Sequence, residues 1–171
     1  MRKILSAGLA IVLACAASGA WAQDKQDKAS QRFLKHVIED NLAEIELGKL
    51  AQQKAQTDAV RTFGQTLVTD HGSANQQATS VAQQMNVTPP SEPNRKQKRE
   101  YQRLSKLSGD KFDRTFARQM VTDHKKDIRA FEKEAKKNDA AGQFAKDTLP
   151  TLRKHLETAQ SLNKSARAQA R

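Results

Sequence analysis

Apolar residues recur every three or four positions along most of the chain beyond residue 23, and they do not alternate in the two-residue period of a strand. Proline, which interrupts helices, is confined to four positions, namely Pro89, Pro90, Pro93 and Pro150. The sequence therefore predicts an all-α protein.

The pattern divides into four long amphipathic segments. The first is expected from about Ala29 to Gln53, and the second follows an N-cap at Thr57 or Asp58 and stops before the sequence VTPPSEPN. The third follows a cap at Asp110, and the fourth starts at 138 or 139 with a kink or a break at Pro150. Four such helices predict a four-helix bundle.

The connection between the second and third helices decides the topology. It contains an extended stretch and then a short basic helix at 95–107, long enough at about 1.5 Å per helical residue to cross the bundle from end to end. We therefore expect a ferritin-like bundle of two antiparallel hairpins over residues 31–163, joined by this long crossover. Residues 23–30 are expected to be flexible, and 164–171 to form a disordered basic tail.

The N-terminus has the pattern of a secretory signal peptide over residues 1–22. Arg2 and Lys3 precede an apolar stretch, and Ala20-Trp21-Ala22 forms a cleavage site. The stretch is too short for a membrane span, so none is expected in the mature protein. An alternative is an imperfect lipoprotein signal at Val12-Leu13-Ala14-Cys15, with acylation of Cys15. Both interpretations predict an exported protein in the periplasm, soluble or lipid-anchored.

The chain carries a formal net charge of +11, which favours encounters with anionic partners. Export argues against nucleic acid and favours anionic components of the envelope. The predicted surface for them is the short basic helix, with Arg95, Lys96, Lys98, Arg99, Arg103 and Lys106. The alternative is that this charge only keeps the protein in solution. The sequence leaves the oligomeric state open.

The string V-T-D-H occurs twice, and it contains two of the four histidines, His71 and His124. Counting residues outward from the tight turns near 56 and 138 places Glu44 level with His71, and His124 level with His155. All four lie on the apolar stripes of their helices. We therefore expect Glu44, His71, His124 and His155 to form one polar layer inside the bundle.

Unpaired polar groups are costly to bury, so the layer needs partners. Three imidazoles and a carboxylate suit a transition metal such as Zn, Fe, Mn or Cu. The alternative is that the groups hydrogen-bond to one another, to nearby carboxylates and to trapped water. Asp70 and Asp123 are rotated about 100° from the layer and are expected to orient an imidazole or lie at the surface. His36 is expected to be solvated.

The motifs NLAEIELGKLAQQKA, VRTFGQTLVTDHGSAN, LSGDKFDRTFARQMVTDH and FAKDTLPTLRKHLETAQSL resemble those of the bacterial exported family known as domain of unknown function 4142. The resemblance covers about Gln31 to Leu162, and it implies a ferritin-like bundle and an envelope location without an established activity. Di-iron bundles carry Glu-x-x-His pairs. Here Val68, Val121 and Leu152 occupy the glutamate positions, which disfavours a di-iron centre.

The sequence contains no motif of a hydrolase. It lacks a Gly-x-Ser-x-Gly elbow and a glycine-rich phosphate loop, and Cys15 is the only cysteine. We therefore assign no enzyme class. The two hypotheses are a metal-binding periplasmic bundle and a non-enzymatic envelope or stress-related protein that binds partners through its basic surface.

Overall fold

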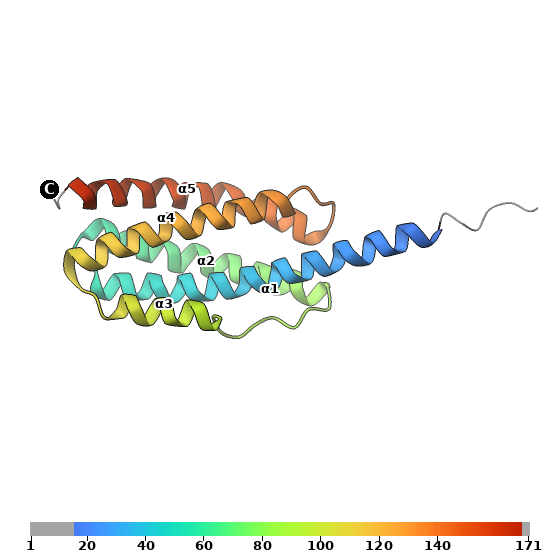
Figure 1. Ribbon diagram of the computed structural model, residues 1–171, viewed down its shortest axis with the longest axis horizontal. Helices are drawn as coiled ribbons and strands as arrows, with labels where there is room; N and C mark the ends of the chain where they lie inside the picture. The colour runs from blue at the N-terminus through green and yellow to red at the C-terminus, as the bar shows by residue number, and fades with distance from the viewer. Residues whose placement is uncertain (1–15, 169–171) are drawn as a thin grey trace, which may run out of the picture.

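The computed structural model describes the backbone of residues 16–168 and the side chains of residues 28–168. This part of the chain is all-α, as predicted, and its helices are α1 (Ala16–Lys54), α2 (Asp58–Gln84), α3 (Arg95–Ser105), α4 (Gly109–Glu134) and α5 (Ala140–Ala168). The four long helices lie side by side, and α3 lies along one side of them (Figure 1). Residues 1–15, with Cys15 and most of the predicted signal peptide, lie outside the described residues.

The long helices form two hairpins, α1 with α2 and α4 with α5. Around the bundle the order of neighbours is α1, α2, α5 and α4. Figure 1 shows that α2 and α4 start at the same end and run in the same direction. The extended segment after α2 and helix α3 return the chain from the end of α2 to the opposite end of the bundle, where α4 begins. This connection is the long crossover that the sequence predicts.

Local signals explain where the helices begin and end. Thr57 caps α2 by accepting a hydrogen bond from the Val60 amide, and α2 ends before Asn86, whose left-handed backbone (φ 55°) is typical of a residue just after a helix. Asn94 starts α3 with a capping box. The cap predicted for α4 was wrong, since Ser108 occupies the N-cap position and Asp110 lies in the first turn.

Two expected boundaries and the expected break at Pro150 differ from the structure. Helix α1 extends back to Ala16, through the segment expected to be flexible, and α5 continues to Ala168, into the expected tail. Both extensions are rich in Ala and contain Lys, residues that favour helix, and neither extension contains proline. Helix α5 also runs unbroken through Pro150, which is exposed. The Lys146 carbonyl that loses its partner there belongs to an exposed residue and can be hydrated.

The apolar core consists of two clusters. One contains Leu34, Val37 and Ile38 of α1 with Phe131 and Phe144, and the other contains Leu47, Phe63, Leu67, Phe112, Phe116 and Met120. On every long helix, the predicted layer residue lies between the positions that enter the first cluster and those that enter the second. The layer is therefore a polar section across an otherwise apolar bundle.

Asp113 fixes the level of one hairpin against the other. Its buried carboxylate accepts hydrogen bonds from the amides of Gln56 and Thr57, both at 2.9 Å, and from the Thr57 hydroxyl at 2.8 Å. These charge-assisted bonds tie the α1–α2 turn to the first turn of α4.

Gly48 and Gly64 face each other and allow α1 and α2 to approach closely enough to bring Glu44 against His71. A Cβ at Gly64 would lie 2.7 Å from the Gly48 carbonyl oxygen, whereas one at Gly72 would meet nothing within 4 Å. We expect Gly64→Ala to lower the free energy of unfolding by about 1–2 kcal/mol, because the helices must separate. Gly72→Ala should raise it by up to about 1 kcal/mol through helix propensity alone. Urea unfolding of both variants measures the contrast, and equal effects would contradict it.

Candidate metal centre

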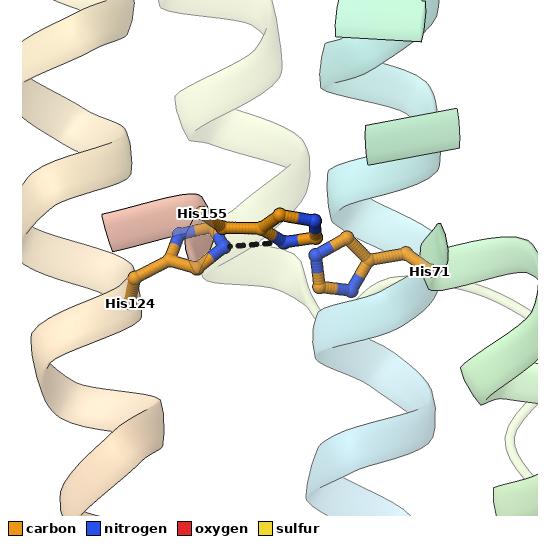
Figure 2. Close-up of side chains that lie close together, drawn as sticks. All are labelled: His71, His124 and His155. Atoms are coloured by element: carbon orange, nitrogen blue, oxygen red, sulfur yellow. Dashed lines mark hydrogen bonds between the residues drawn. The ribbon is translucent and has the colours of Figure 1, made fainter. Parts of the chain in front are cut away.

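Four buried side chains, one from each long helix, meet between the two apolar clusters. Glu44, His71, His124 and His155 are each no more than 4% exposed. The three rings point toward one another (Figure 2), and one nitrogen from each lies within 4.8 Å of the others. The structure therefore brings together all four residues of the predicted layer.

His71 bridges α2 to α1 through both of its nitrogens. Its Nδ1 lies 2.9 Å from the Asn41 side-chain oxygen, and its Nε2 lies 2.5 Å from Oε2 of Glu44. Asn41 and Glu44 are three residues apart and so share one face of α1. The contact with Glu44 is close but lacks hydrogen-bond geometry, which leaves both carboxylate oxygens and His71 Nε2 without a hydrogen-bond partner.

His124 and His155 join α4 to α5. His124 Nδ1 lies 3.0 Å from the Met120 carbonyl oxygen, and His124 Nε2 lies 3.2 Å from His155 Nδ1. His155 Nε2 lies 2.8 Å from Oδ2 of Asp70 on α2. His124 Nδ1 also lies 3.6 Å from Oε1 of Glu44, beyond hydrogen-bond distance. These contacts close a ring around all four long helices.

The acceptors assign the protons on the neutral rings. His124 and His155 each have one nitrogen facing an oxygen that can only accept, the Met120 carbonyl or Asp70 Oδ2. A neutral ring has a single N–H, and it belongs on that outer nitrogen. His71 faces such an oxygen on both sides, Asn41 Oδ1 at 2.9 Å and Glu44 Oε2 at 2.5 Å. With its N–H directed to Asn41, His71 Nε2 joins His124 Nε2 and His155 Nδ1 in presenting a lone pair to the interior. We call these three atoms the inner nitrogens.

The protonation states of His155, His124 and Glu44 suit metal binding. Burial lowers the pKa of His155 to about 4, with His71 adding to the effect and the Asp70 hydrogen bond opposing it. Burial also lowers the pKa of His124. Burial alone would raise the pKa of Glu44, but the surrounding His124 and His71 hold it below its ordinary value. Neutral imidazoles beside an ionised carboxylate are the forms that bind metal.

The distances test whether an ion fits. Two nitrogens that each bind Zn²⁺ at 2.0–2.1 Å with tetrahedral geometry lie about 3.3 Å apart. The inner nitrogens of His124 and His155 are separated by 3.2 Å, which matches this spacing. Glu44 and His71 at 2.5 Å are closer than two ligands of one ion, so they would separate on binding. The outer hydrogen bonds provide the support that metal-ligating histidines ordinarily have.

Asp70 and Asp123 occupy different environments. Asp70 orients an imidazole, although it is His155 on a neighbouring helix rather than the adjacent His71. Asp123 bonds to no described imidazole and instead lines a cavity between α1, α3 and α4. His36 is solvated, as predicted, with 46% of its side chain exposed beside Asp40. Asn41 is a site residue that was not predicted, although its position one turn before Glu44 on the same apolar stripe was a usable signal.

The predicted basic surface on α3 is largely exposed but partly neutralised. Lys96 lies 3.6 Å from Glu100, Lys98 forms a salt bridge of 2.7 Å with Glu92, and Arg103 bonds to Gln119. Arg95, Arg99 and Lys106 are exposed. Among the described helices, none combines the length and apolar character that a membrane span requires.

The chain matches the family described as "Domain of unknown function (DUF4142)" over residues 15–162. No curated protein matches it. Its fold is similar to the crystal structure of a DUF305 fragment from Deinococcus radiodurans, with a TM-score of 0.71, 15% sequence identity, and coverage of 80% of this chain and 96% of that one. At this identity the likeness concerns the fold alone. The family match extends over most of the sequence, and the chain belongs to the DUF4142 family.

Proposed function

We propose that this protein is an exported, ferritin-like four-helix bundle that binds one transition-metal ion through His71, His124, His155 and Glu44. The observation that carries the proposal is the convergence of three buried imidazoles whose ligand atoms lie within 4.8 Å of one another. The outer nitrogens of His124 and His155 already have acceptors, while His71 Nε2 and both Glu44 carboxylate oxygens have no hydrogen-bond partner. A bound cation would satisfy them together with the Glu44 carboxylate.

The donor set favours some metals over others. Three imidazoles and one carboxylate suit Zn²⁺, Cu²⁺ or Fe²⁺ better than Mg²⁺ or Ca²⁺, which prefer oxygen ligands. The absence of Glu-x-x-His pairs favours a single ion over a di-iron pair. Export is supported by the signal-like pattern of Arg2, Lys3 and Ala20-Trp21-Ala22. The ferritin-like assignment is supported by the parallel course of α2 and α4 on either side of the long crossover.

Elemental analysis tests this function directly. Protein purified without chelators should carry close to one transition-metal ion per chain, or take up one when Zn²⁺, Cu²⁺, Fe²⁺ or Mn²⁺ is added to the metal-free protein. Isothermal titration would give the stoichiometry. Less than about 0.1 ion per chain with no gain on reconstitution would end the proposal.

A second candidate function is binding to an anionic phospholipid surface. The basic surface of α3 is one candidate for the membrane-binding surface, and a groove between α4 and α5 is another. Two adjoining cavities of about 730 and 270 Å³ form this groove. Its lining includes six basic residues, none of which forms a salt bridge with a described residue: Lys111, Arg114, Arg118, Lys125, Lys164 and Arg167.

Two matched variants locate the membrane-binding surface. The variant with Arg118, Lys164 and Arg167 replaced by Gln should lose most binding to vesicles containing phosphatidylglycerol, because these cations form no salt bridge with a described residue. Arg95, Lys96 and Arg99 replaced by Gln remove the same charge and should lose less. Sedimentation over a salt series measures both, since such binding weakens as ionic strength rises. Wild-type protein that stays in the supernatant at low salt would exclude this function.

A further inference from the structure

An acidic cavity of about 220 Å³ lies against the polar layer, between α1, α3 and α4. Its lining includes five carboxyl side chains: Asp40, Glu44, Glu100, Asp123 and Asp127. The whole chain has 30 Lys and Arg residues against 19 Asp and Glu, so more than a quarter of its acids line one cavity of a basic protein. Lys96 and Lys126 also line the cavity, so five carboxyl groups face two ammonium groups there, and the local balance is acidic although the net charge of the chain is positive.

Several of these carboxylates lack the partners that buried acids ordinarily have. Asp123 is only partly exposed and forms no hydrogen bond or salt bridge with a described residue. Asp127 is 7% exposed, and the Lys126 ammonium lies 3.9 Å from it. Glu44 is 4% exposed, and its Oε1 has no hydrogen-bond partner. Unpaired buried charge is costly, so the cavity is suited to a cation that is not part of the chain.

Glu44 belongs to both the cavity and the histidine cluster. It lines the cavity, while its Oε2 contacts the inner nitrogen of His71. A cation in the cavity would therefore meet Glu44 before any imidazole of the histidine cluster. Successive oxygen ligands could replace its hydration water before it reaches the nitrogens.

We propose that the acidic cavity is the entrance through which a divalent cation reaches the three histidines, with Asp123 and Asp127 attracting it and Glu44 transferring it to the inner nitrogens. This inference rests on the proposed function. Lys126 is the competing cation, because its ammonium lies 3.4 Å from Asp40 and 3.9 Å from Asp127 and must be displaced when a metal enters.

A second approach to the cluster is less suitable. A cavity of about 150 Å³ lies between α2 and α5, and its lining includes Asp70, Asp147, Thr148 and Thr151. A cation entering there would meet the outer nitrogen of His155, which donates to Asp70, rather than the inner lone pair. Asp147 therefore offers a matched control, since it is an exposed aspartate near the cluster but on the other route.

Stopped-flow uptake of Co²⁺ by the metal-free full chain tests the route. At pH 8, above the pKa of about 7 of the Asp123 carboxyl, Asp123→Asn should slow association by about 3- to 10-fold at low salt, because one attracting charge is lost. Lys126→Gln should accelerate association several-fold by removing the competing cation. Asp147→Asn should match wild type. The differences among variants should shrink as ionic strength rises, and far-UV circular dichroism verifies that each variant is folded.

The outcomes separate the route from the site. If wild type binds Co²⁺ and Asp123→Asn and Asp127→Asn both associate at the wild-type rate, the entrance is elsewhere and this inference is overturned. Slowing by Asp147→Asn alone would assign entry to the Asp70 side. If wild type binds no Co²⁺ at all, the metal site itself fails, and the entrance fails with it.

Discussion

Replacing His124 and His155 together by alanine is expected to weaken metal binding by about 10⁴-fold or more. The apparent binding free energy of a four-ligand zinc site is about 10–16 kcal/mol, or roughly 3 kcal/mol per ligand. Each 1.4 kcal/mol changes affinity about tenfold, so two lost ligands account for this factor. Each single variant should lose about 100-fold. Competition with a chromophoric chelator measures the dissociation constants.

This pair is the most suitable double variant because His124 Nε2 and His155 Nδ1 face each other at 3.2 Å, so that removing both leaves neither ring without its partner. Removing both leaves the Met120 carbonyl within α4 and the partly exposed Asp70, which water can reach. Far-UV circular dichroism should therefore change little. His36→Ala is the matched control, because that histidine is exposed and lies eight residues before Glu44 on α1, and this variant should bind metal at equilibrium like wild type. Undiminished affinity in the double variant would refute the ligand assignment.

Asp123→Asn is expected to stabilise the metal-free protein at pH 8 by about 2 kcal/mol, with the gain disappearing toward pH 4. Burial, together with the charges of Glu44 and Glu100, raises the pKa of Asp123 to about 7. Above pH 7 its carboxylate therefore destabilises the folded state relative to the unfolded state. Below pH 4 the group is protonated in both states, and the cost vanishes. The full shift corresponds to about 4 kcal/mol, which partial exposure reduces.

Urea unfolding in the presence of a chelator, repeated from pH 4 to pH 8, measures this effect. The control is Asp147→Asn, which removes the same charge from an exposed position and should change the free energy of unfolding by less than about 0.5 kcal/mol at every pH. A gain that is equally large at pH 4, or absent at pH 8, would show that Asp123 is not held at a raised pKa.

The two expected effects of Asp123 have opposite signs for stability and for metal entry. A carboxylate that destabilises the folded protein near neutral pH would be retained if it speeds the uptake of a cation. Such a conflict between stability and activity is common at functional sites. A variant that is both more stable and slower to bind Co²⁺ would connect the acidic cavity to function through one residue.

The sequence by itself determined the helices and the height of the polar layer. Periodicity and the positions of proline identified the four long helices and the short basic one. The tight turns near 56 and 138 placed Glu44 level with His71 and His124 level with His155, because both helices of an antiparallel hairpin rise equally per residue from the turn. The positions of these residues on the apolar stripes turned them toward the interior.

Only the tertiary structure decided which groups meet across the two hairpins. The contact between Asp70 and His155, the lack of a bond between Asp123 and any described imidazole, and the acidic cavity all depend on how α2 packs on α5 and α1 on α4. Residue spacing fixes distances along a helix, but not the rotation of one hairpin against another. That rotation follows from core packing and from specific ties such as Asp113 to the α1–α2 turn. The spacing of residues along the sequence specifies neither the core packing nor these contacts between the hairpins.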